Sequence, residues 1–287
     1  MTELTQILKN TVNQLLKDHV SHRVLESSEN GNFPYKLWDA LEENGLTQPL
    51  VSEGNGGAGA LFTEVYEIIY GAGYYAAPVP LIETILASWL AEKTGLPIPK
   101  GPISVLENRP NNAPKLFRSA SEWFLSGAAP QTPWGKEAKG ALVITNGEGA
   151  LRAALVQTCR ASVTADFNMA REPRDTVIFE KTPINAISEP LNYEISKDVI
   201  KLYGAMFRAA QIAGASQRAL DLSIEYARER RAFGQTIGKF QAVQHQLAKL
   251  AARVAQAAMA AESAFRTADY GDPRFQISVA KIVAGQT

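Results

Sequence analysis

The stretch from Tyr226 to Gln241 constrains the fold most, because it interrupts two long alanine-rich segments of helical periodicity. It reads Tyr-Ala-Arg-Glu-Arg-Arg-Ala-Phe-Gly-Gln-Thr-Ile-Gly-Lys-Phe-Gln. Apolar residues recur at three- and four-residue intervals before it, over 199–227, and after it, over 243–265. This spacing predicts two helices of a bundle, joined at a corner that Phe233 and Gly234 make.

Three arginines at this corner, Arg228, Arg230 and Arg231, have two interpretations. Cations in the last turn of a helix interact favourably with its dipole, and a following glycine commonly ends the helix. Alternatively, guanidinium groups beside exposed aromatic residues would form a fork for phosphates with a flat surface for a ring. Local chemistry alone favours the first interpretation, because most charge clusters are solvated helix ends.

Bulk composition narrows the class of protein. The 287 residues suffice for two or three compact units, and the charge balance of 29 basic against 29 acidic residues argues against nucleic-acid or membrane-surface binding by net charge. We expect no secretory signal, no membrane span and no metal site, because no segment or Cys/His spacing fits one. The single cysteine, Cys159, is expected to be a small buried residue in a reducing cytoplasm.

The sequence divides into three segments, which predict a multi-domain α+β fold. Residues 1–99 have the helical spacing of an all-helical domain, with a glycine-rich turn segment at 48–59. Residues 100–192 contain short β-forming runs without intervening helices, which predict a small antiparallel barrel or sandwich. Residues 193–287 predict a helical bundle, which Ser196 can begin as a cap. Strands are expected from Ile103, Glu122, Gly140, Ala153, Ser162 and Thr176, with a turn at Asn146-Gly147.

The corner resembles the hairpin signature of acyl-CoA dehydrogenases, Tyr-Ala-x-x-Arg-x-x-Phe-Gly-x-x-Ile-x-x-x-Gln, which it matches without a gap. In that family the hairpin reaches into the FAD site of a neighbouring subunit. The resemblance therefore implies that Arg230, Ala232, Phe233 and Gln241 contact the pyrophosphate and adenosine part of a flavin. It also implies an oligomer, a dimer or tetramer. The order of helical, β and helical segments agrees with the family over nearly the whole chain.

Other positions depart from the family's pattern. Its reaction removes an α-proton from an acyl-CoA with a glutamate base while a hydride passes from the β-carbon to the flavin. On the first bundle helix, the position of that glutamate in one branch is here Gly204, beside Ala205; in the larger branch it lies beyond Thr287. The family's flavin loop is replaced over 106–113, and the last bundle helices are absent, so the bundle looks incomplete.

Three further residues could compensate for the missing base or bind the substrate. Asp198 and Glu194 are nearby carboxylates, which could equally favour the helix N-terminus electrostatically. Arg208 lies one turn after Gly204 and could hold a CoA phosphate or carbonyl, although a solvated or salt-bridged arginine is the simpler interpretation. No catalytic residue is assigned.

The resemblance implies an FAD-linked acyl-CoA dehydrogenase that desaturates an acyl-CoA thioester. It indicates a short, β-type subunit of a heteromeric enzyme, which shares its flavin site with a partner carrying the base. Such subunits resemble those used on bulky acyl-CoAs such as steroid side chains, with electron-transfer flavoprotein as the expected acceptor. The alternative is a non-catalytic scaffold subunit of the same fold that binds no flavin.

Overall fold

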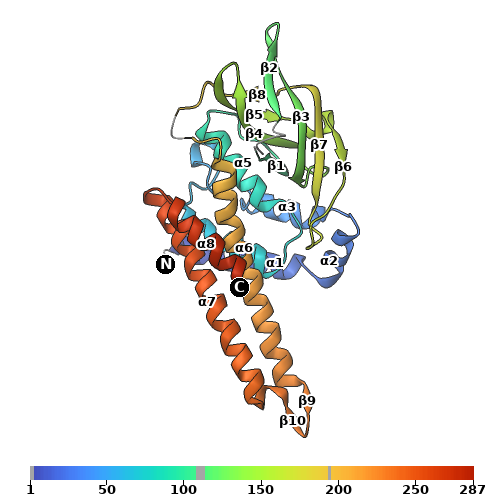
Figure 1. Ribbon diagram of the computed structural model, residues 1–287, viewed down its shortest axis with the longest axis vertical. Coiled ribbons are helices and arrows are strands. Elements are labelled where there is room, and N and C mark those ends of the chain that lie inside the picture. Colours follow the sequence, from blue (N-terminus) through green and yellow to red (C-terminus); the bar gives the residue numbers. More distant parts are fainter. Residues whose placement is uncertain (1–2, 108–113, 193–194) are drawn as a thin grey trace. The chain divides into compact units, whose positions relative to one another are not determined.

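The computed structural model of the chain describes residues 3–107, 114–192 and 195–287 (Figure 1). The chain forms two compact units, and each unit is built from separated stretches of sequence. The first comprises Met1–Val20, Leu61–Ala77 and Ala205–Thr287, and the second comprises Ser21–Ala60 and Pro78–Gly204. The three-segment division at 1–99, 100–192 and 193–287 stays a prediction about the organisation of the sequence.

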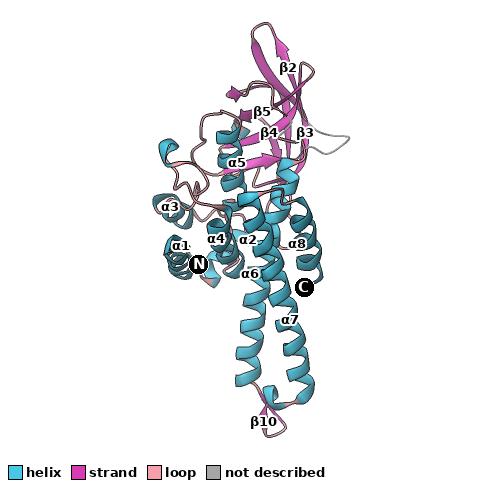
Figure 2. Cartoon of the chain, turned by 90° about the vertical axis from the view of Figure 1, so that its left-hand side faces the viewer, coloured by secondary structure: helices cyan, strands magenta, loops and turns pink. Residues whose placement is uncertain are grey.

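Helices form both ends of the sequence, and strands form its middle (Figure 2). The α-helices in the described residues are α1 (Glu3–His19), α2 (His22–Glu29), α3 (Tyr35–Glu43), α4 (Phe62–Tyr74), α5 (Leu81–Lys93), α6 (Val199–Glu229), α7 (Gln241–Tyr270) and α8 (Arg274–Gln286). The sequence had not indicated α2, whose start is capped by Ser21 through a hydrogen bond from the Val24 N–H.

Helix α4 is the centre of the first unit, and glycines let its neighbours approach closely. A Cβ atom at Gly71 would lie 2.7 Å from Val12 Cγ1 of α1, and one at Gly214 of α6 would lie 2.0 Å from the Tyr70 carbonyl oxygen. Side chains at these positions would therefore drive the helices apart. The glycines fix how tightly α1, α4 and α6 pack.

The first turn of α4 receives its cap from a residue about two hundred positions later. The carboxylate of Asp269, at the end of α7, accepts hydrogen bonds from the N–H groups of Phe62 (2.6 Å) and Thr63 (3.0 Å) and from the Thr63 hydroxyl. Glu64 accepts a further bond from the Leu61 N–H at 2.9 Å. These carboxylates satisfy donors that the start of a helix leaves unpaired.

The β segment of the second unit contains two four-stranded sheets. Their orders are β1-β4-β5-β8 and β2-β3-β7-β6. The strands are β1 (Ile103–Leu106), β2 (Lys115–Ser119), β3 (Glu122–Pro133), β4 (Gly140–Gly147), β5 (Ala150–Val156), β6 (Ser162–Thr164), β7 (Arg174–Pro183) and β8 (Ala186–Ile187). Residues of both sheets form one buried apolar cluster, which includes Leu116, Leu125, Val143 and Phe179. The predicted small β unit is confirmed, and β2 and β8 are additions to it.

Three expectations for this unit need correction. The β1–β4 pair is parallel, whereas all other strand pairs in the described sheets are antiparallel. The turn after β4 lies at Glu148-Gly149, with φ of 49° and 78°, because Asn146 and Gly147 still pair with β5. Cys159 is exposed rather than buried, since it lies in a short 3-10 turn (Thr158–Arg160) outside the strands.

Candidate functional site

The predicted corner is a small β-hairpin at the end of two long helices. Helix α6 ends at Glu229, strands β9 (Arg231–Ala232) and β10 (Gln235–Thr236) pair antiparallel, and a 3-10 turn (Ile237–Lys239) leads into α7 at Gln241. Figures 1 and 2 both show α6 and α7 running side by side to this tip. The helix–corner–helix prediction is therefore confirmed, and the hairpin strands add detail that periodicity alone did not give.

The tip itself requires a left-handed backbone at two successive residues. Phe233 has φ of 52° and Gly234 has φ of 82°, between the paired residues Ala232 and Gln235. Two-residue hairpin turns of this kind need positive φ at both central positions. Glycine adopts a positive φ without steric cost, but the same conformation costs a residue with a Cβ atom about 1–2 kcal/mol. A phenylalanine that is 96% exposed at this strained position gains little from burial, which marks it as a candidate for function.

Phe240 is the ring that meets Phe233 edge-on within the described residues, and the cations around Phe233 face solvent. The two ring centroids lie 6.2 Å apart, at an interplanar angle of 82°. The Arg230 N–H donates to the Tyr226 carbonyl (2.9 Å), while the Arg230 carbonyl accepts from the Ile237 N–H (2.8 Å). The backbone of Arg230 is thus fixed while its side chain is exposed.

The four residues proposed to contact the cofactor all lie at the hairpin, between the end of α6 and the start of α7. Arg230, Phe233 and Gln241 are exposed, and Ala232 is half-buried in β9. A guanidinium group with five N–H donors fits a pyrophosphate, and an exposed aromatic face fits a purine ring. The residues present therefore fit the adenosine diphosphate part of a flavin dinucleotide.

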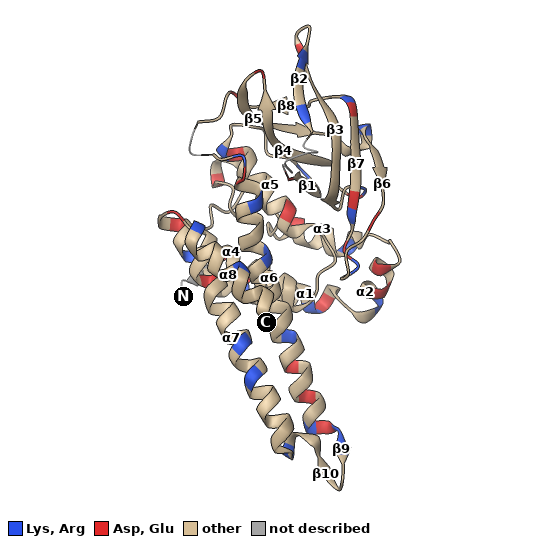
Figure 3. Ribbon diagram, in the orientation of Figure 1, with Lys and Arg blue, Asp and Glu red and all other residues tan. Residues whose placement is uncertain are grey.

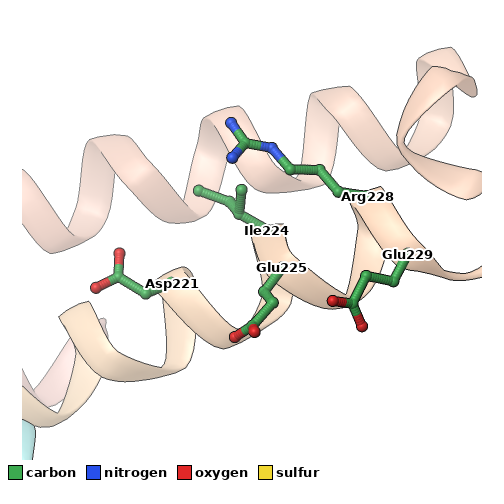
Figure 4. A pocket seen from close by; sticks show the side chains of 5 residues that line it. All are labelled: Asp221, Ile224, Glu225, Arg228 and Glu229. Atoms are coloured by element: carbon green, nitrogen blue, oxygen red, sulfur yellow. The ribbon is translucent and has the colours of Figure 1, made fainter.

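Beside the hairpin, one side of α6 lines a depression of about 510 Å³. It is lined by Asp221, Ile224, Glu225, Arg228 and Glu229. Figure 4 shows Glu225 and Glu229 projecting to the same side of α6, and Ile224 and Arg228 to another. Three carboxylates would repel phosphate groups, so the arginines at the tip suit a diphosphate better than this depression does.

A polar network that sequence reasoning missed holds the stem of α6 against α4. Asp221 accepts hydrogen bonds from the Tyr74 hydroxyl (2.9 Å) and from Gln217 Nε2 (2.8 Å). The guanidinium of Arg218 lies 5.5 Å from the centre of the Tyr74 ring. Burial, followed by the negative charge of Asp221, raises the pKa of Tyr70 to about 12. No motif marks this network, because it joins residues almost 150 positions apart.

Of the positions considered for a catalytic base, the one near the start of α6 carries no carboxylate. Gly204 lies inside the helix, and a Cβ atom built on it meets nothing within 4 Å. Ala205 beside it is half-buried. Asp198 is exposed just before α6, where its N–H donates to Ser196 Oγ at 3.2 Å. Glu194 lies outside the described residues.

Arg208, the other residue considered on α6, is engaged within the helix. Its Nη1 donates to Gln211 Oε1 at 2.5 Å. The partner is a neutral amide, so this bond is not the salt bridge of the simpler interpretation.

The described part of the chain offers neither a cluster of metal ligands nor a helix suited to a membrane span. No group of three or more His, Cys, Asp or Glu side chains there could hold a metal ion. No helix of the described ranges combines the length and apolarity needed to cross a bilayer.

Comparison with known proteins gives consistent results. Residues 2–95 match the family model for the acyl-CoA dehydrogenase N-terminal domain, and residues 202–287 match that for the acyl-CoA dehydrogenase C-terminal domain. The chain is 24% identical over 260 residues to acyl-CoA dehydrogenase IpdE2 of Mycolicibacterium smegmatis, covering 90% of this chain and 75% of that protein.

Solved structures agree with the fold. The ChsE4-ChsE5 complex from Mycobacterium tuberculosis superposes with a TM-score of 0.88 at 20% identity, covering 100% of this chain and 84% of that chain. A variant of the Tcur3481-Tcur3483 steroid acyl-CoA dehydrogenase gives a TM-score of 0.83 at 23% identity, covering 97% and 82%. At these identities the similarity establishes the fold alone.

The two family models bracket the β unit and include the hairpin, so the resemblance first seen at residues 226–241 extends to both ends of the chain. The expected α+β fold, the FAD cofactor and the oxidoreductase class acting on acyl-CoA are confirmed at the level of the family. The chain belongs to the acyl-CoA dehydrogenase family.

Proposed function

We propose that this chain is a subunit of a heteromeric, FAD-linked acyl-CoA dehydrogenase. In this proposal the chain contributes Arg230, Ala232, Phe233 and Gln241 to a flavin site that a partner subunit completes. The partner, which is another acyl-CoA dehydrogenase-like chain, supplies the carboxylate base. Electrons then pass to an electron-transfer flavoprotein.

One contrast supports the proposal. The tip that would contact the adenosine diphosphate is preserved and presented to solvent, with Phe233 96% exposed. The helix position that could carry the base is a glycine with open space above it. A chain that presents residues for the adenosine diphosphate part but has no carboxylate at the base position requires a second chain to complete the site.

Each residue has a distinct task in this assignment. The Arg230 guanidinium would neutralise and orient the pyrophosphate, and the Phe233 ring would cover the adenine face. The left-handed turn keeps the ring in the exposed position from which it can stack. When bound, the flavin accepts the hydride from the β-carbon of the substrate. The residue that takes the α-proton belongs to the partner.

A bulky acyl-CoA is the substrate class we propose. The solved relatives include a two-component steroid acyl-CoA dehydrogenase and the ChsE4-ChsE5 complex. A Cβ atom built on Gly204 would meet no atom within 4 Å, so this position offers no obstacle to a fused-ring acyl group. We also propose a cytoplasmic location, which the single cysteine supports.

Visible absorption of the purified chain tests the proposal, first alone and then co-expressed with an acyl-CoA dehydrogenase-like chain encoded beside it. Oxidised flavin absorbs at about 450 nm. We expect this band only in the complex. A coloured chain on its own would overturn the shared site, and no colour in either preparation would favour the non-catalytic scaffold.

Variants at the tip test which residues hold the cofactor. Arg230→Ala should weaken flavin retention by the complex at least about tenfold, because a charge-assisted hydrogen bond is worth about 1.5–3 kcal/mol. Phe233→Ala should weaken it through lost stacking. Lys239→Ala is the matched control, since Lys239 is an exposed cation of the same hairpin. Equal flavin retention in Arg230→Ala and Lys239→Ala would contradict the assignment of Arg230.

A further inference from the structure

A small cavity of about 40 Å³ in the second unit is lined by three aromatic rings and two carboxylates. Phe33 comes from the loop between α2 and α3, and Trp134 and Glu137 come from the segment between β3 and β4. Phe167 comes from the loop between β6 and β7, and Asp175 comes from β7. The cavity is therefore enclosed by three segments that are far apart in the sequence but belong to one unit.

One carboxylate oxygen at this cavity has no donor. Within the described residues, Oε2 of Glu137 is buried and accepts no hydrogen bond. The carboxylate of Asp175 differs, because it accepts the backbone N–H groups of Lys136 at 2.9 Å and of Asp166 at 3.2 Å. Burial, followed by the charge of Asp175, raises the pKa of Glu137. A buried acceptor without a donor is unfavourable, so a donor from outside the chain would stabilise this site.

The aromatic walls favour a positively charged donor. The centroids of Phe33 and Trp134 lie 6.0 Å apart at an interplanar angle of 85°, so the two rings form adjoining walls. The third ring, Phe167, already attracts one cation, because the guanidinium of Arg171 lies 4.8 Å from its centre. Aromatic faces attract cations through their quadrupole. The rings and the carboxylates thus favour the same class of ligand.

The size and ligand set of the cavity favour an ammonium group over a metal ion. Ca²⁺ takes six or more oxygen ligands, and no group of three or more His, Cys, Asp or Glu in the described residues could hold a metal. A cavity needs only about 10–15 Å³ to hold one water molecule, so this cavity admits a primary ammonium group. Figure 3 shows acidic and basic residues interspersed along α2, β6 and β7, so no broad acidic surface attracts cations of every kind there.

We propose that this cavity binds a primary ammonium group, whose N–H donors pair with the Glu137 carboxylate between the rings of Phe33 and Trp134. An ammonium group carries three donors, so it can supply the one that Oε2 lacks. Lys136 also lines the cavity, and its charge opposes the rise in the Glu137 pKa without cancelling it. The ligand is a free alkylamine or the end of a lysine side chain. The site is separate from the proposed flavin contacts, because no residue of the hairpin lines it.

Titration of the full chain with n-butylammonium chloride, followed by saturation-transfer NMR, tests the proposal. Glu137→Gln keeps the shape of the side chain and should raise the dissociation constant at least about tenfold, because a hydrogen bond to a charged group is lost. Phe33→Leu should weaken binding less, through the loss of one aromatic wall. Glu122→Gln is the matched control, since Glu122 is an exposed acid of β3, and it should bind like wild type.

The pH dependence gives a second measurement. The carboxyl of Glu137 has a raised pKa and binds an ammonium group in its ionised form, so wild-type affinity should increase as the pH rises through that pKa. Glu137→Gln should show no such increase. Asp175, Lys136 and Arg171 stay unchanged in this variant, so a pH dependence that persisted in it would overturn the assignment of Glu137.

Two further probes identify the source and the class of the ligand. Binding of both n-butylammonium and Nα-acetyl-lysine N-methylamide would identify a lysine side chain as the ligand, and binding of n-butylammonium alone would identify a free amine. The proposal is overturned if neither amine binds, if potassium chloride competes equally well with them, or if Glu137→Gln binds like wild type. Circular dichroism would show that each variant keeps its fold.

Discussion

Removing the carboxylate of Asp269 should destabilise the first unit through a helix in a different part of the sequence. The carboxylate accepts two backbone N–H groups and one hydroxyl at the start of α4. The residue preceding α4 is Leu61, whose apolar side chain offers no cap. Asp269→Ala therefore leaves the Phe62 and Thr63 N–H groups without their acceptor.

The magnitude follows from those contacts. Losing an N-cap side chain costs about 0.5–2 kcal/mol, and losing an anion at a helix N-terminus adds about 0.3–1 kcal/mol. The hydroxyl bond contributes further, but the site is only half-buried and water can replace part of it. We expect Asp269→Ala to lower the free energy of unfolding by about 2–3 kcal/mol. Asp269→Asn should cost about half as much, because its amide oxygen can still accept.

Urea denaturation followed by circular dichroism measures this change, and hydrogen exchange locates it. The Phe62 and Thr63 amides should lose protection in Asp269→Ala. Asp272→Asn is the control, because its carboxylate is exposed and the asparagine amide oxygen can still accept the Arg274 N–H bond at the start of α8. We expect the control to stay within about 0.5 kcal/mol of wild type. An Asp269→Ala protein as stable as the control would refute the capping argument.

The remaining predictions concern two glycine substitutions on α6 and the ionisation of Tyr70. Gly214→Ala should cost more than about 3 kcal/mol in urea denaturation, because its Cβ atom would lie 2.0 Å from the Tyr70 carbonyl oxygen. Gly204→Ala should stabilise by about 0.5–1 kcal/mol, since its Cβ atom meets open space and alanine favours a helix; equal effects of the two would show that close packing does not decide them. Tyr70 should ionise at about pH 12 in an ultraviolet titration. Its pKa is raised above the unfolded value of about 10, so its contribution to stability is complete below pH 10 and is lost as the pH rises toward 12; Asp221→Asn should lower this pKa, and an unchanged titration would contradict the role of that charge.

Periodicity and turn chemistry placed the Phe233-Gly234 corner correctly but misplaced the turn after β4. The Phe233-Gly234 corner follows from the demand of a two-residue turn for positive φ, and the structure has φ of 52° and 82° there. The strand from Gly140 was correctly placed by its apolar run, but its turn was set two residues early. Asn146-Gly147 is a strong hairpin signal, yet pairing with β5 extends through it to Glu148-Gly149. Tertiary pairing overrode the local preference.

Burial was predicted less well than helix position, for a related reason. On α7, Val254, Ala257, Ala261, Ala264 and Phe265 are buried, whereas Val243, Leu247 and Leu250, which belong to the same apolar period over 243–265, are half-buried. A 3.6-residue period shows which side of a helix is apolar, but it does not show what covers that side. The half of α7 near the tip lacks a full cover within the described chain, as expected of a surface that meets another subunit.

The sequence by itself determined the helical segments other than α2, the existence of a β unit, the corner and its family signature, because each depends on residues within a few turns of one another. Only the tertiary structure decided that Asp269 caps α4, that Asp221 binds Tyr74 and that Gly214 admits the Tyr70 backbone. Those contacts join residues more than a hundred positions apart, and no local pattern encodes them. They form because packing α1, α4, α6 and α7 together removes apolar surface from water and brings these polar groups close enough to pair.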